Sequence, residues 1–476
     1  MAEAADLREH AAAILRAAVE VVLPERLFHA ARGGLSLVGP ADRMVHAATD
    51  LLPIVELASC DRIVVVGGGK AAAGLAAGLE TLLGPARIAR HRLTGLVSVP
   101  AGCGRRLAAI EVRETRPPGV NLPTPEVVQA TREMLALIGA LEPRDLVIAV
   151  VSGGGSALLA APVPGVTLEE KIAVTRFLSA AGAGIAEINA VRGATSGVKA
   201  GGLARACAAG RLVAVVLSDV IGDPLDVIAS GPCASSVASA AAALRVLARC
   251  GAEQAGIAPG LRAFLDRAAR AASDEPRAGV TSQSCPGMWT TPRGCLVSQV
   301  LLGSNATAVD AAAAMARRLG YATTIGRPAA AGAAAEAVGR RLADEALALS
   351  AAARSDGRPR ALVEGGEATV ALPEAHGVGG RNQHTVLAAL AKLGPDWPAG
   401  TLLASLGSDG EDGPTDAAGA SADADVVAAI DRQRLDVQSA LADCDAYRLL
   451  DAAAGLIRTG PTGTNVADIR IVLARP

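Results

Sequence analysis

The sequence predicts an α/β protein with two domains: an N-terminal doubly wound parallel sheet of the Rossmann-like kind and a smaller C-terminal α/β domain. Three observations support this fold class. Apolar, β-branched runs alternate with helical segments through residues 60–235. Four apolar runs along the chain end directly in a glycine-rich turn, as buried parallel strands do beside a ligand site. A chain of 476 residues is long enough for two or three domains.

Residues 1–272 are expected to form the N-terminal domain. Amphipathic patterns predict two helices at its start, 4–22 and 41–58. Apolar runs then predict strands at 63–66, 94–99, 146–151 and 212–217. Helices are expected between these strands, from 71 to about 83, from about 124 to 140 and from about 167 to 186, and again over 236–272.

A linker or insertion is expected at 273–295, because this stretch is rich in Ser, Thr, Pro and Gly and has no periodicity. The second domain is expected to span 296–476. Its predicted strands are 296–302, 321–325, 360–364, 368–372, 402–406 and 468–473. Its predicted helices include 305–319, 333–353 and 381–393.

Composition excludes several classes of protein. The net charge of −2 favours neither a nucleic-acid surface nor an acidic tail. The eight cysteines form no CxxC pair and have no histidine spacing typical of zinc. The chain starts without a basic, apolar leader, and its alanine-rich runs are interrupted by charges. A cytoplasmic protein without a membrane partner is therefore expected, and a homodimer is left open.

The first glycine-rich turn joins a strand to a helix. It contains Gly67, Gly68, Gly69 and Lys70. A lysine in such a turn suits a phosphate or carboxylate at the helix N-terminus. The turn also fits a dinucleotide fingerprint, but no Asp or Glu for a ribose occurs over 81–110, which disfavours a nicotinamide cofactor.

The second glycine-rich turn comprises Ser152, Gly153, Gly154, Gly155 and Ser156. Its backbone amides and two hydroxyls are typical of an anion-binding nest. The pattern is neither G-x-S-x-G nor a Walker A motif, so a serine hydrolase and a P-loop enzyme are disfavoured.

The third and fourth turns carry aspartates. Asp219 follows one strand, and Asp409 and Asp416 follow another. Aspartates in glycine turns are often solvated turn formers. Two such clusters beside anion loops also suit Mg²⁺, which binds one or two carboxylates together with substrate phosphates. We expect a catalytic or metal-binding role for Asp219 and Asp409.

Several cations are singled out by their context. Lys70 and Lys199 lie in glycine-rich segments of a chain that otherwise uses arginine, whereas Lys171 follows two glutamates and is expected to be exposed. Arg381 lies at a predicted helix start, where a guanidinium can hold a carboxylate or stabilise a transferring phosphoryl group. His384, three residues later, is expected to be exposed.

Taken together, these segments resemble the class II glycerate kinases, or glycerate 2-kinases, whose C-terminal part is called the MOFRL domain. The resemblance runs from about residue 8 to 473, and the MOFRL part spans about 362–473. It is carried by these segments: RIVVVGGGKAAAGLAAGLE, SGGGSALLAAPVPGVTLEEK, LSDVIGDPLDVIASGP, GSNATAVDAAAAMARRLGY, GGEATV, GGRNQ, GSDGEDGPTDAAGA and GPTGTN. Members are also often labelled hydroxypyruvate reductases.

The resemblance implies ATP- and Mg²⁺-dependent phosphorylation of D-glycerate at its 2-hydroxyl, in a cleft between two α/β domains. It implies catalytic roles for Lys70, Arg381 and either Asp219 or Asp409. Asp409 and Asp416 are the implied ligands of Mg²⁺. Further substrate- or nucleotide-binding residues on this reading are Gly67, Gly68, Gly69, Ser152, Gly153, Gly154, Gly155, Ser156, Asn189, Arg192, Lys199, Asn305, Glu367, Asn382 and Asn465.

Two segments depart from the family's usual pattern. Gly193 and Ala194 stand where members usually carry Lys-His, and residues 114–125 lack the His and Asp of a Gly-His-Pro-x-Pro-Asp loop. The insertion at 281–296 is also unusual. Three alternatives therefore stay open: a kinase for another small hydroxy acid, a nicotinamide-dependent hydroxypyruvate reductase, and a weakly active or non-catalytic relative.

Overall fold

The computed structural model describes residues 2–31, 34–36, 57–117, 120, 122–274, 288–328 and 332–476. The chain forms two compact units. The seven-stranded unit comprises Leu27–Leu217 and Asp223–Leu302, and the six-stranded unit comprises Met1–Arg26, Ser218–Gly222 and Gly303–Pro476. The prediction of a two-domain α/β protein is confirmed. The predicted helix at 41–58 lies outside the described residues except for its last two.

The seven-stranded sheet has the strand order β5-β4-β3-β6-β7-β9-β8. Its strands are β3 (Ile63–Gly68), β4 (Thr94–Pro100), β5 (Ile110–Arg116), β6 (Leu146–Val151), β7 (Arg211–Leu217), β8 (Met288–Thr290) and β9 (Leu296–Gly303). β3 pairs in parallel with both β4 and β6. The chain thus winds outward from β3 to β5, and then returns to β6 on the other side of β3. This is the predicted doubly wound order.

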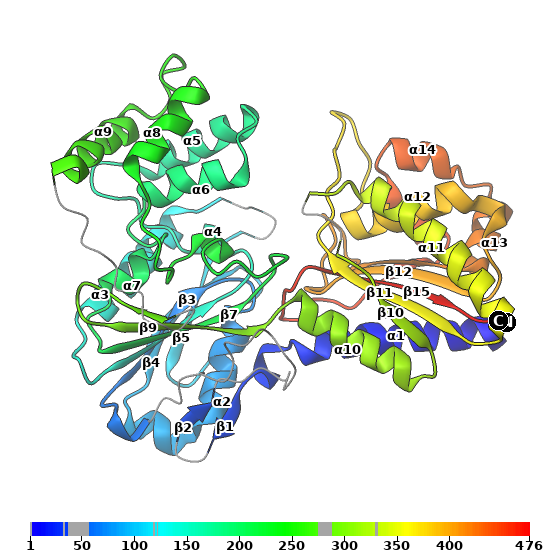
Figure 1. The fold of residues 1–476 in the computed structure, drawn as a ribbon, viewed down its shortest axis with the longest axis horizontal. Helices are drawn as coiled ribbons and strands as arrows, with labels where there is room; N and C mark the ends of the chain where they lie inside the picture. The colour runs from blue at the N-terminus through cyan, green and yellow to red at the C-terminus, as the bar shows by residue number, and fades with distance from the viewer. Residues whose placement is uncertain are drawn as a thin grey trace. The chain divides into compact units, whose positions relative to one another are not determined.

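Helices flank this sheet, and a second group of helices has a core of its own (Figure 1). The flanking helices are α2 (Ala72–Arg90), α3 (Pro125–Gly139), α4 (Gly155–Leu158) and α7 (Gly202–Ala206). The second group consists of α5 (Leu168–Ala180), α6 (Ile185–Ala194), α8 (Ala240–Arg249) and α9 (Pro259–Asp274). The single helix predicted over 167–186 is two helices, because Gly182 adopts a φ of +73° and the chain turns before α6. A short hairpin of β1 (His29–Ala31) and β2 (Gly34–Ser36) completes the unit's strands.

The division into units differs from the predicted ranges at three places: at the first helix, over Ser218–Gly222 and at β9. β9 lies beside β7 in the seven-stranded sheet, so the boundary falls after this strand rather than before it. β8, inside the predicted linker, pairs with β9 and buries Trp289, whose indole donates to the carbonyl of Cys233 at 3.1 Å. The first helix, α1 (Ala2–Val21), belongs to the six-stranded unit. Local sequence patterns identify strands and helices, but they do not say which sheet an element joins.

The six-stranded sheet has the order β10-β11-β15-β12-β13-β14. Its strands are β10 (Ala322–Ile325), β11 (Arg360–Gly366), β12 (Thr401–Gly407), β13 (Gly419–Ala422), β14 (Leu456–Ile457) and β15 (Asp468–Ala474). β12 was expected to be parallel, but it is antiparallel to both of its neighbours. An uninterrupted apolar run reports burial on both faces, not strand direction. The strand predicted over 368–372 is reduced to one bridge, between Thr369 and Ala334.

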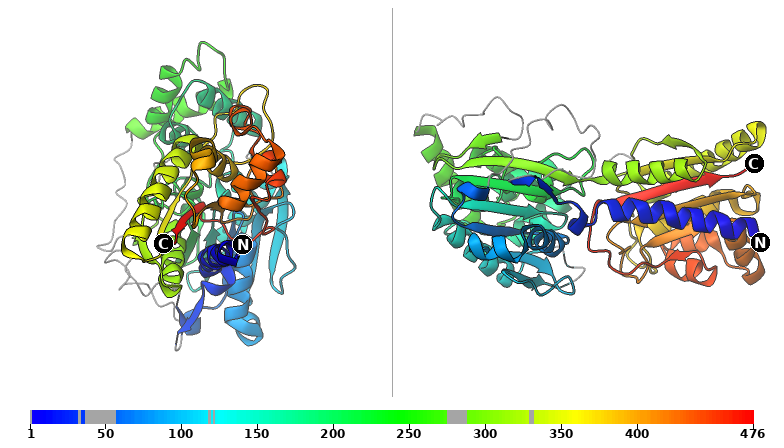
Figure 2. Two further views of the ribbon diagram at one scale, coloured as in Figure 1. Left: turned by 90° about the vertical axis from the view of Figure 1, so that its right-hand side faces the viewer. Right: turned by 90° about the horizontal axis from the view of Figure 1, so that it is seen from below.

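Helices cover both faces of this sheet. One face is covered by α1 and α10 (Asn305–Arg318), which lie side by side in Figure 2. The other face is covered by α11 (Ala335–Asp356), α12 (Arg381–Leu393), α13 (Ala424–Gln433), α14 (Val437–Ala442) and α15 (Ala446–Ala452) (Figure 1). A Cβ on Gly339 of α11 would lie 2.1 Å from the carbonyl oxygen of Thr385 in α12, so this glycine allows the two helices to pack closely. No described helix is both long and apolar enough to cross a membrane.

Candidate functional site

In the seven-stranded unit, the first two glycine-rich turns lie next to each other. The turn at 67–70 follows β3, and the turn at 152–156 follows β6, its parallel neighbour. β3 and β6 are the strands between which the winding direction reverses. Open α/β sheets bind ligands beyond the carboxyl ends of their strands at this switch point.

The two turns hold each other in place. The N–H of Lys70 donates to the carbonyl of Gly153 at 2.8 Å, and the N–H of Ala71 donates to Oγ of the buried Ser152 at 3.0 Å. Gly69 adopts a φ of +146°, and a Cβ there would lie 2.1 Å from Oγ of Ser152. Part of the predicted anion nest is thus used inside the protein, because Ser152 serves to fix the first turn. The half-buried side chain of Lys70 passes close to Gly154.

Ser156 is the centre of a cluster of cations. Nζ of Lys199 donates to the carbonyl oxygen of Ser156 at 2.7 Å, and Nη2 of Arg192 donates to its Oγ at 2.6 Å. Oγ of Ser230 lies 2.8 Å from Oγ of Ser156. Asn189 accepts weakly from Arg192, at 3.5 Å. The structure therefore brings together four of the predicted binding residues.

The third cation of this cluster is Lys171, which was wrongly expected to be exposed. It is buried, and its Nζ donates to the carbonyl of Thr195 at 2.8 Å and to that of Arg192 at 3.1 Å. Burial and the nearby Arg192 lower the pKa of Lys171 to about 7. Burial, followed by the charges of Arg192 and Lys171, lowers the pKa of Lys199 well below its ordinary value.

None of these three cations forms an ion pair with an Asp or Glu that the structure describes. Buried positive charge without a counter-ion is costly, and a bound anion relieves that cost. The cluster around Ser156 is therefore a candidate anion site. Gly193 lies in the same helix, and a Cβ there would be 3.3 Å from Cβ of both Ala200 and Ala238. The family pattern carries a lysine at this position, and a side chain here would require these neighbours to shift by a few tenths of an ångström.

In the six-stranded unit, the candidate site lies where three strands meet. β11 and β12 both run antiparallel to β15, which lies between them, so their carboxyl ends flank its first residue. In this register, Asp468 faces Gly366 of β11 and Gly407 of β12. Asp468 was not among the site residues predicted from the sequence. Its signal was an acid at the start of an otherwise apolar strand, followed by Arg470 on the same face.

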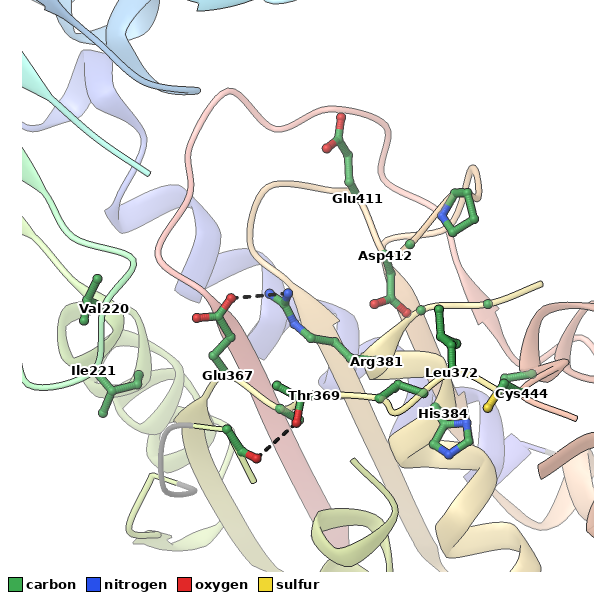
Figure 3. A pocket seen from close by; sticks show the side chains of 18 residues that line it. Val220, Ile221, Glu367, Thr369, Leu372, Arg381, His384, Glu411, Asp412 and Cys444 are labelled. Atoms are coloured by element: carbon green, nitrogen blue, oxygen red, sulfur yellow. Dashed lines mark hydrogen bonds and ion pairs between the residues drawn. The ribbon is translucent and has the colours of Figure 1, made fainter. Parts of the chain in front are cut away.

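Asp468 fixes the predicted catalytic arginine. Nε of Arg381 lies 2.9 Å from Oδ1 and 3.0 Å from Oδ2 of Asp468, and Nη2 lies 2.9 Å from Oδ1. The side chains of Asp468 and Arg470 are fully buried and lie 3.0 Å apart. On its other side, Nη1 of Arg381 lies 3.4 Å from Oε1 of Glu367 (Figure 3). Burial raises the pKa of Glu367. A guanidinium held on two sides has one orientation, as electrostatic catalysis requires.

The start of α12 is capped from another loop. The carboxylate of Asp412 accepts from the N–H groups of Asn382 at 3.0 Å and of Gln383 at 2.8 Å. Burial, only partly offset by these hydrogen bonds, raises the pKa of Asp412 to about 6. A Cβ on Gly380 would lie 2.2 Å from Cγ of Asp412, so this glycine is needed for the contact. The cap places Arg381 at the first turn of the helix.

Two predicted binding residues have structural roles here. Asn382 is buried, donates from Nδ2 to Asp468 at 3.0 Å and accepts from Oγ of Ser405 at 2.5 Å. Asn305 donates from Nδ2 to the carbonyls of Val466 at 2.8 Å and Asp468 at 2.9 Å. Both side chains hold the start of β15, so they support the site rather than line it.

The predicted acids Asp219, Asp409 and Asp416 each have contacts of their own. No three His, Cys, Asp or Glu side chains of the described chain are grouped so that they could hold an ion. Asp416 forms an exposed pair with Nε of Arg458 at 2.9 Å and accepts from Oη of Tyr447 at 2.8 Å. Oδ1 of Asp409 accepts from the N–H of Glu411 at 3.1 Å. Oδ2 of Asp219 accepts a long hydrogen bond from Nδ2 of Asn465, at 3.5 Å.

A pocket of about 490 Å³ opens beside Arg381, and its whole lining belongs to the six-stranded unit. Figure 3 shows Arg381 and Glu367 on one side of it, and Leu372, His384 and Cys444 together on another. The prediction that His384 is exposed is wrong: 7% of this residue is accessible. The polar residues in the first turns of α12 are buried, although their sequence pattern is typical of an exposed helix start.

These geometries define a class: a two-domain α/β protein with a candidate anion site in one unit and an oriented arginine beside a pocket in the other. Residues 10–266 match the family described as "Domain of unknown function (DUF4147)", and residues 360–468 match the "MOFRL family". The chain is 34% identical to glycerate kinase of Homo sapiens, with 100% of this chain and 95% of that protein covered. It is 33% identical to D-glycerate 2-kinase of Thermotoga maritima, with 98% of each chain covered.

The fold agrees with these relatives. A crystal structure of glycerate kinase from Thermotoga maritima matches with a TM-score of 0.78 and 32% identity, covering 98% of this chain and 99% of that chain. The chain therefore belongs to the glycerate kinase family with a C-terminal MOFRL domain, and it is a kinase. The family expected from the sequence motifs is confirmed.

Proposed function

We propose that this kinase transfers the γ-phosphoryl group of ATP, used as its Mg²⁺ complex, to the 2-hydroxyl of D-glycerate, giving 2-phosphoglycerate. The cation cluster around Ser156 is the observation that carries the proposal. It offers Arg192 and Lys199 to an anion, with no described acid paired to either. The relative named D-glycerate 2-kinase, which this chain matches over almost its whole length, supports the choice of substrate and product.

In this proposal, the seven-stranded unit supplies positive charge to the anionic groups of the reactants. Lys70 is presented from a turn locked by Ser152 and Gly153, so its backbone is fixed before any ligand binds. Phosphoryl transfer places charge on the equatorial oxygens and on the leaving oxygen, and little covalent chemistry is left for the protein. Lys70 and the Ser156 cluster would act by position and charge.

Arg381 is the corresponding group of the six-stranded unit. Asp468 holds Nε and Nη2, whereas Nη1 points to Glu367 on the pocket side. We assign Arg381 to the phosphate oxygens of the nucleotide. The proton of the 2-hydroxyl needs an acceptor, and Asp219 and Asp409 are the proposed candidates.

Mg²⁺ enters this proposal with the nucleotide and not as a resident ion. The pair predicted to bind it, Asp409 and Asp416, does not fit a resident site, because Asp416 is engaged with Arg458 and Tyr447. Mg²⁺ in kinases is commonly held by one or two carboxylates plus the substrate's phosphates. A cytoplasmic location and a homodimer also remain predictions.

A kinase for a different small hydroxy acid is the second candidate. One observation favours it: Gly193 stands where the family pattern carries a lysine, so this chain lacks that cation next to Arg192. The hydroxypyruvate reductase alternative has less support, because residues 81–110 contain no acid for a ribose.

The experiment is turnover by the purified full chain with ATP, Mg²⁺ and D-glycerate, followed as ADP release. Parallel reactions replace D-glycerate with L-glycerate, lactate and tartronate, and one reaction contains hydroxypyruvate with NADH or NADPH. The proposal expects ADP release with D-glycerate above the others and no oxidation of the reduced cofactors. Faster turnover of another hydroxy acid would replace the substrate, and cofactor oxidation without ADP release would overturn the proposal.

A further inference from the structure

The pocket beside Arg381 has two chemically different ends (Figure 3). One end carries the guanidinium of Arg381 and the carboxylate of Glu367. The other end is walled by Leu372, Cys444 and His384. Leu372 is a large apolar side chain that is 59% exposed at this wall. A ligand that fills the pocket therefore needs a charged part and a part with apolar faces.

Size excludes the smaller reactant as the main occupant. The volume of about 490 Å³ lies within the usual range for small-molecule sites, about 300–1,000 Å³. A three-carbon hydroxy acid would occupy a small part of it and would leave the apolar wall in water. A nucleotide has both a size of this order and the required change from apolar ring to charged chain.

His384 supplies a polar group that no described residue uses. The residue is 7% exposed and lines the pocket, yet neither ring nitrogen has a hydrogen-bond partner in the described part of the chain. Burial lowers its pKa, with a smaller opposing effect from Glu336, so the ring is neutral at pH 7. A neutral imidazole offers one donor and one acceptor, which suits the edge of a nucleobase better than a phosphate.

The backbone next to this wall adds a second polar edge. Thr369 pairs through its N–H and C=O with Ala333 and Ala335. In an extended chain, successive residues direct these groups to opposite sides. The N–H of Ala368 points to the carboxylate of Asp468 at 3.4 Å, which is the side of Arg381. Val370, two residues later, lines the pocket, and none of the hydrogen bonds found among the described residues uses its N–H or C=O.

We propose that this pocket of the six-stranded unit binds the nucleoside part of the donor nucleotide, with a purine base between Leu372 and His384 and the phosphates directed to Arg381. The inference rests on the proposed function in one respect, that a nucleotide is the phosphoryl donor. Three carboxylates, those of Glu367, Glu411 and Asp412, line the pocket, and Glu367 lies beside Arg381. The phosphates must therefore arrive with their Mg²⁺, as in the MgATP complex.

The test is calorimetric binding of ADP and of the non-hydrolysable analogue AMP-PNP, with Mg²⁺, to the full chain and four variants. H384F keeps a ring but removes both nitrogens, and L372D places a charge at the apolar wall. The matched controls are H376F and L347D, at an exposed histidine and a 41% exposed leucine that do not line the pocket. We expect Kd to rise about fivefold in H384F, the loss of about one hydrogen bond. We expect a rise of about tenfold or more in L372D, and no change in the controls.

Steady-state kinetics separates this inference from the proposed function. If both are right, H384F and L372D raise the KM for ATP and leave the KM for D-glycerate unchanged. Unchanged nucleotide binding in both variants, or a raised KM for glycerate alone, overturns the inference even if the wild type phosphorylates glycerate. If the wild type does not use glycerate but the two variants still lose nucleotide affinity, the inference stands and the proposed substrate fails. Circular dichroism confirms that each variant is folded.

Discussion

Asp468→Asn is the most informative substitution for the account of Arg381. The carboxylate receives hydrogen bonds from Arg381, from Nη2 of Arg470 at 3.0 Å and from Nδ2 of Asn382 at 3.0 Å. Every one of these partners is a donor. The side-chain NH₂ of asparagine would replace one carboxylate oxygen, and at either position it would face hydrogen-bond donors. The substitution also removes the negative charge between the guanidinium groups of Arg381 and Arg470.

The magnitude follows from burial. Removing one member of a buried ion pair costs about 3–5 kcal/mol, because the remaining charge has no counter-ion. Arg470 retains Glu364, 3.7 Å away, so we expect the lower part of this range for the stability of the six-stranded unit. Arg381 loses its orientation, and misplacing a catalytic group by about 1 Å costs about 100-fold in rate. We expect kcat/KM to fall by about that factor, mainly through kcat.

The assay combines urea unfolding with steady-state kinetics, and Asp145→Asn is the matched control. Asp145 makes a similar two-point pair with Arg62, with Nη2 at 2.6 Å and Nε at 3.0 Å from Oδ2, in the seven-stranded unit. The control should lose stability and keep its kinetic constants. If Asp468→Asn keeps kcat/KM within about twofold of wild type, a change of about 0.4 kcal/mol, then Asp468 does not orient Arg381 for catalysis.

Three further predictions follow from the same contacts. Lys70→Ala and Arg381→Ala should each lower kcat/KM by about 100-fold or more, roughly 3 kcal/mol, and near-wild-type activity in both would remove these residues from the catalytic set. The folded pKa of Asp412, about 6, lies above its ordinary 3.8, so folding takes up a proton in that window. Relative to Asp412→Asn, the unfolding free energy of the wild type should therefore fall as pH rises from about 4 to about 6 and then level off, and a rise would contradict the assignment. Gly69→Ala, with its Cβ 2.1 Å from Oγ of Ser152, should lower both the melting temperature and kcat. Gly139→Ala, with 3.7 Å of clearance in a helix, should not, and equal effects of the two alanines would refute the role of the locked turn.

Much of the fold could be predicted because its signals are local. β3, β4, β6 and β7 of the seven-stranded sheet are apolar runs that end in a turn, and glycine marks the turns at 67–69 and 153–155. The parallel strand β5 was not predicted, because four of its seven residues are charged. The pairing of those turns across β3 and β6 also follows from general rules of strand order. The sequence does not predict which unit α1 and β9 belong to, because an amphipathic helix or an apolar strand can pack in either unit.

The site was predictable only where a residue's role depends on its own segment. Arg381 was found because it starts a helix after two glycines. Asp468 was not predicted because its role is to bind Arg381, which lies 87 residues earlier in the chain. Lys171 was predicted to be exposed because two glutamates precede it in the sequence. Its side chain is buried because its hydrogen-bond acceptors lie at the end of α6, which is distant in the sequence. His384 and Asn382 are polar residues in a helix whose first turns are buried, which no local pattern reveals.

The central claim is the reaction itself, and the position of the transferred phosphate tests it most directly. Phosphorus NMR of the product formed from ATP, Mg²⁺ and D-glycerate separates 2-phosphoglycerate from 3-phosphoglycerate. The account predicts 2-phosphoglycerate with the wild type and its loss in Arg381→Ala. Formation of 3-phosphoglycerate, or no phosphorylated glycerate from a folded protein that binds nucleotide, would contradict it.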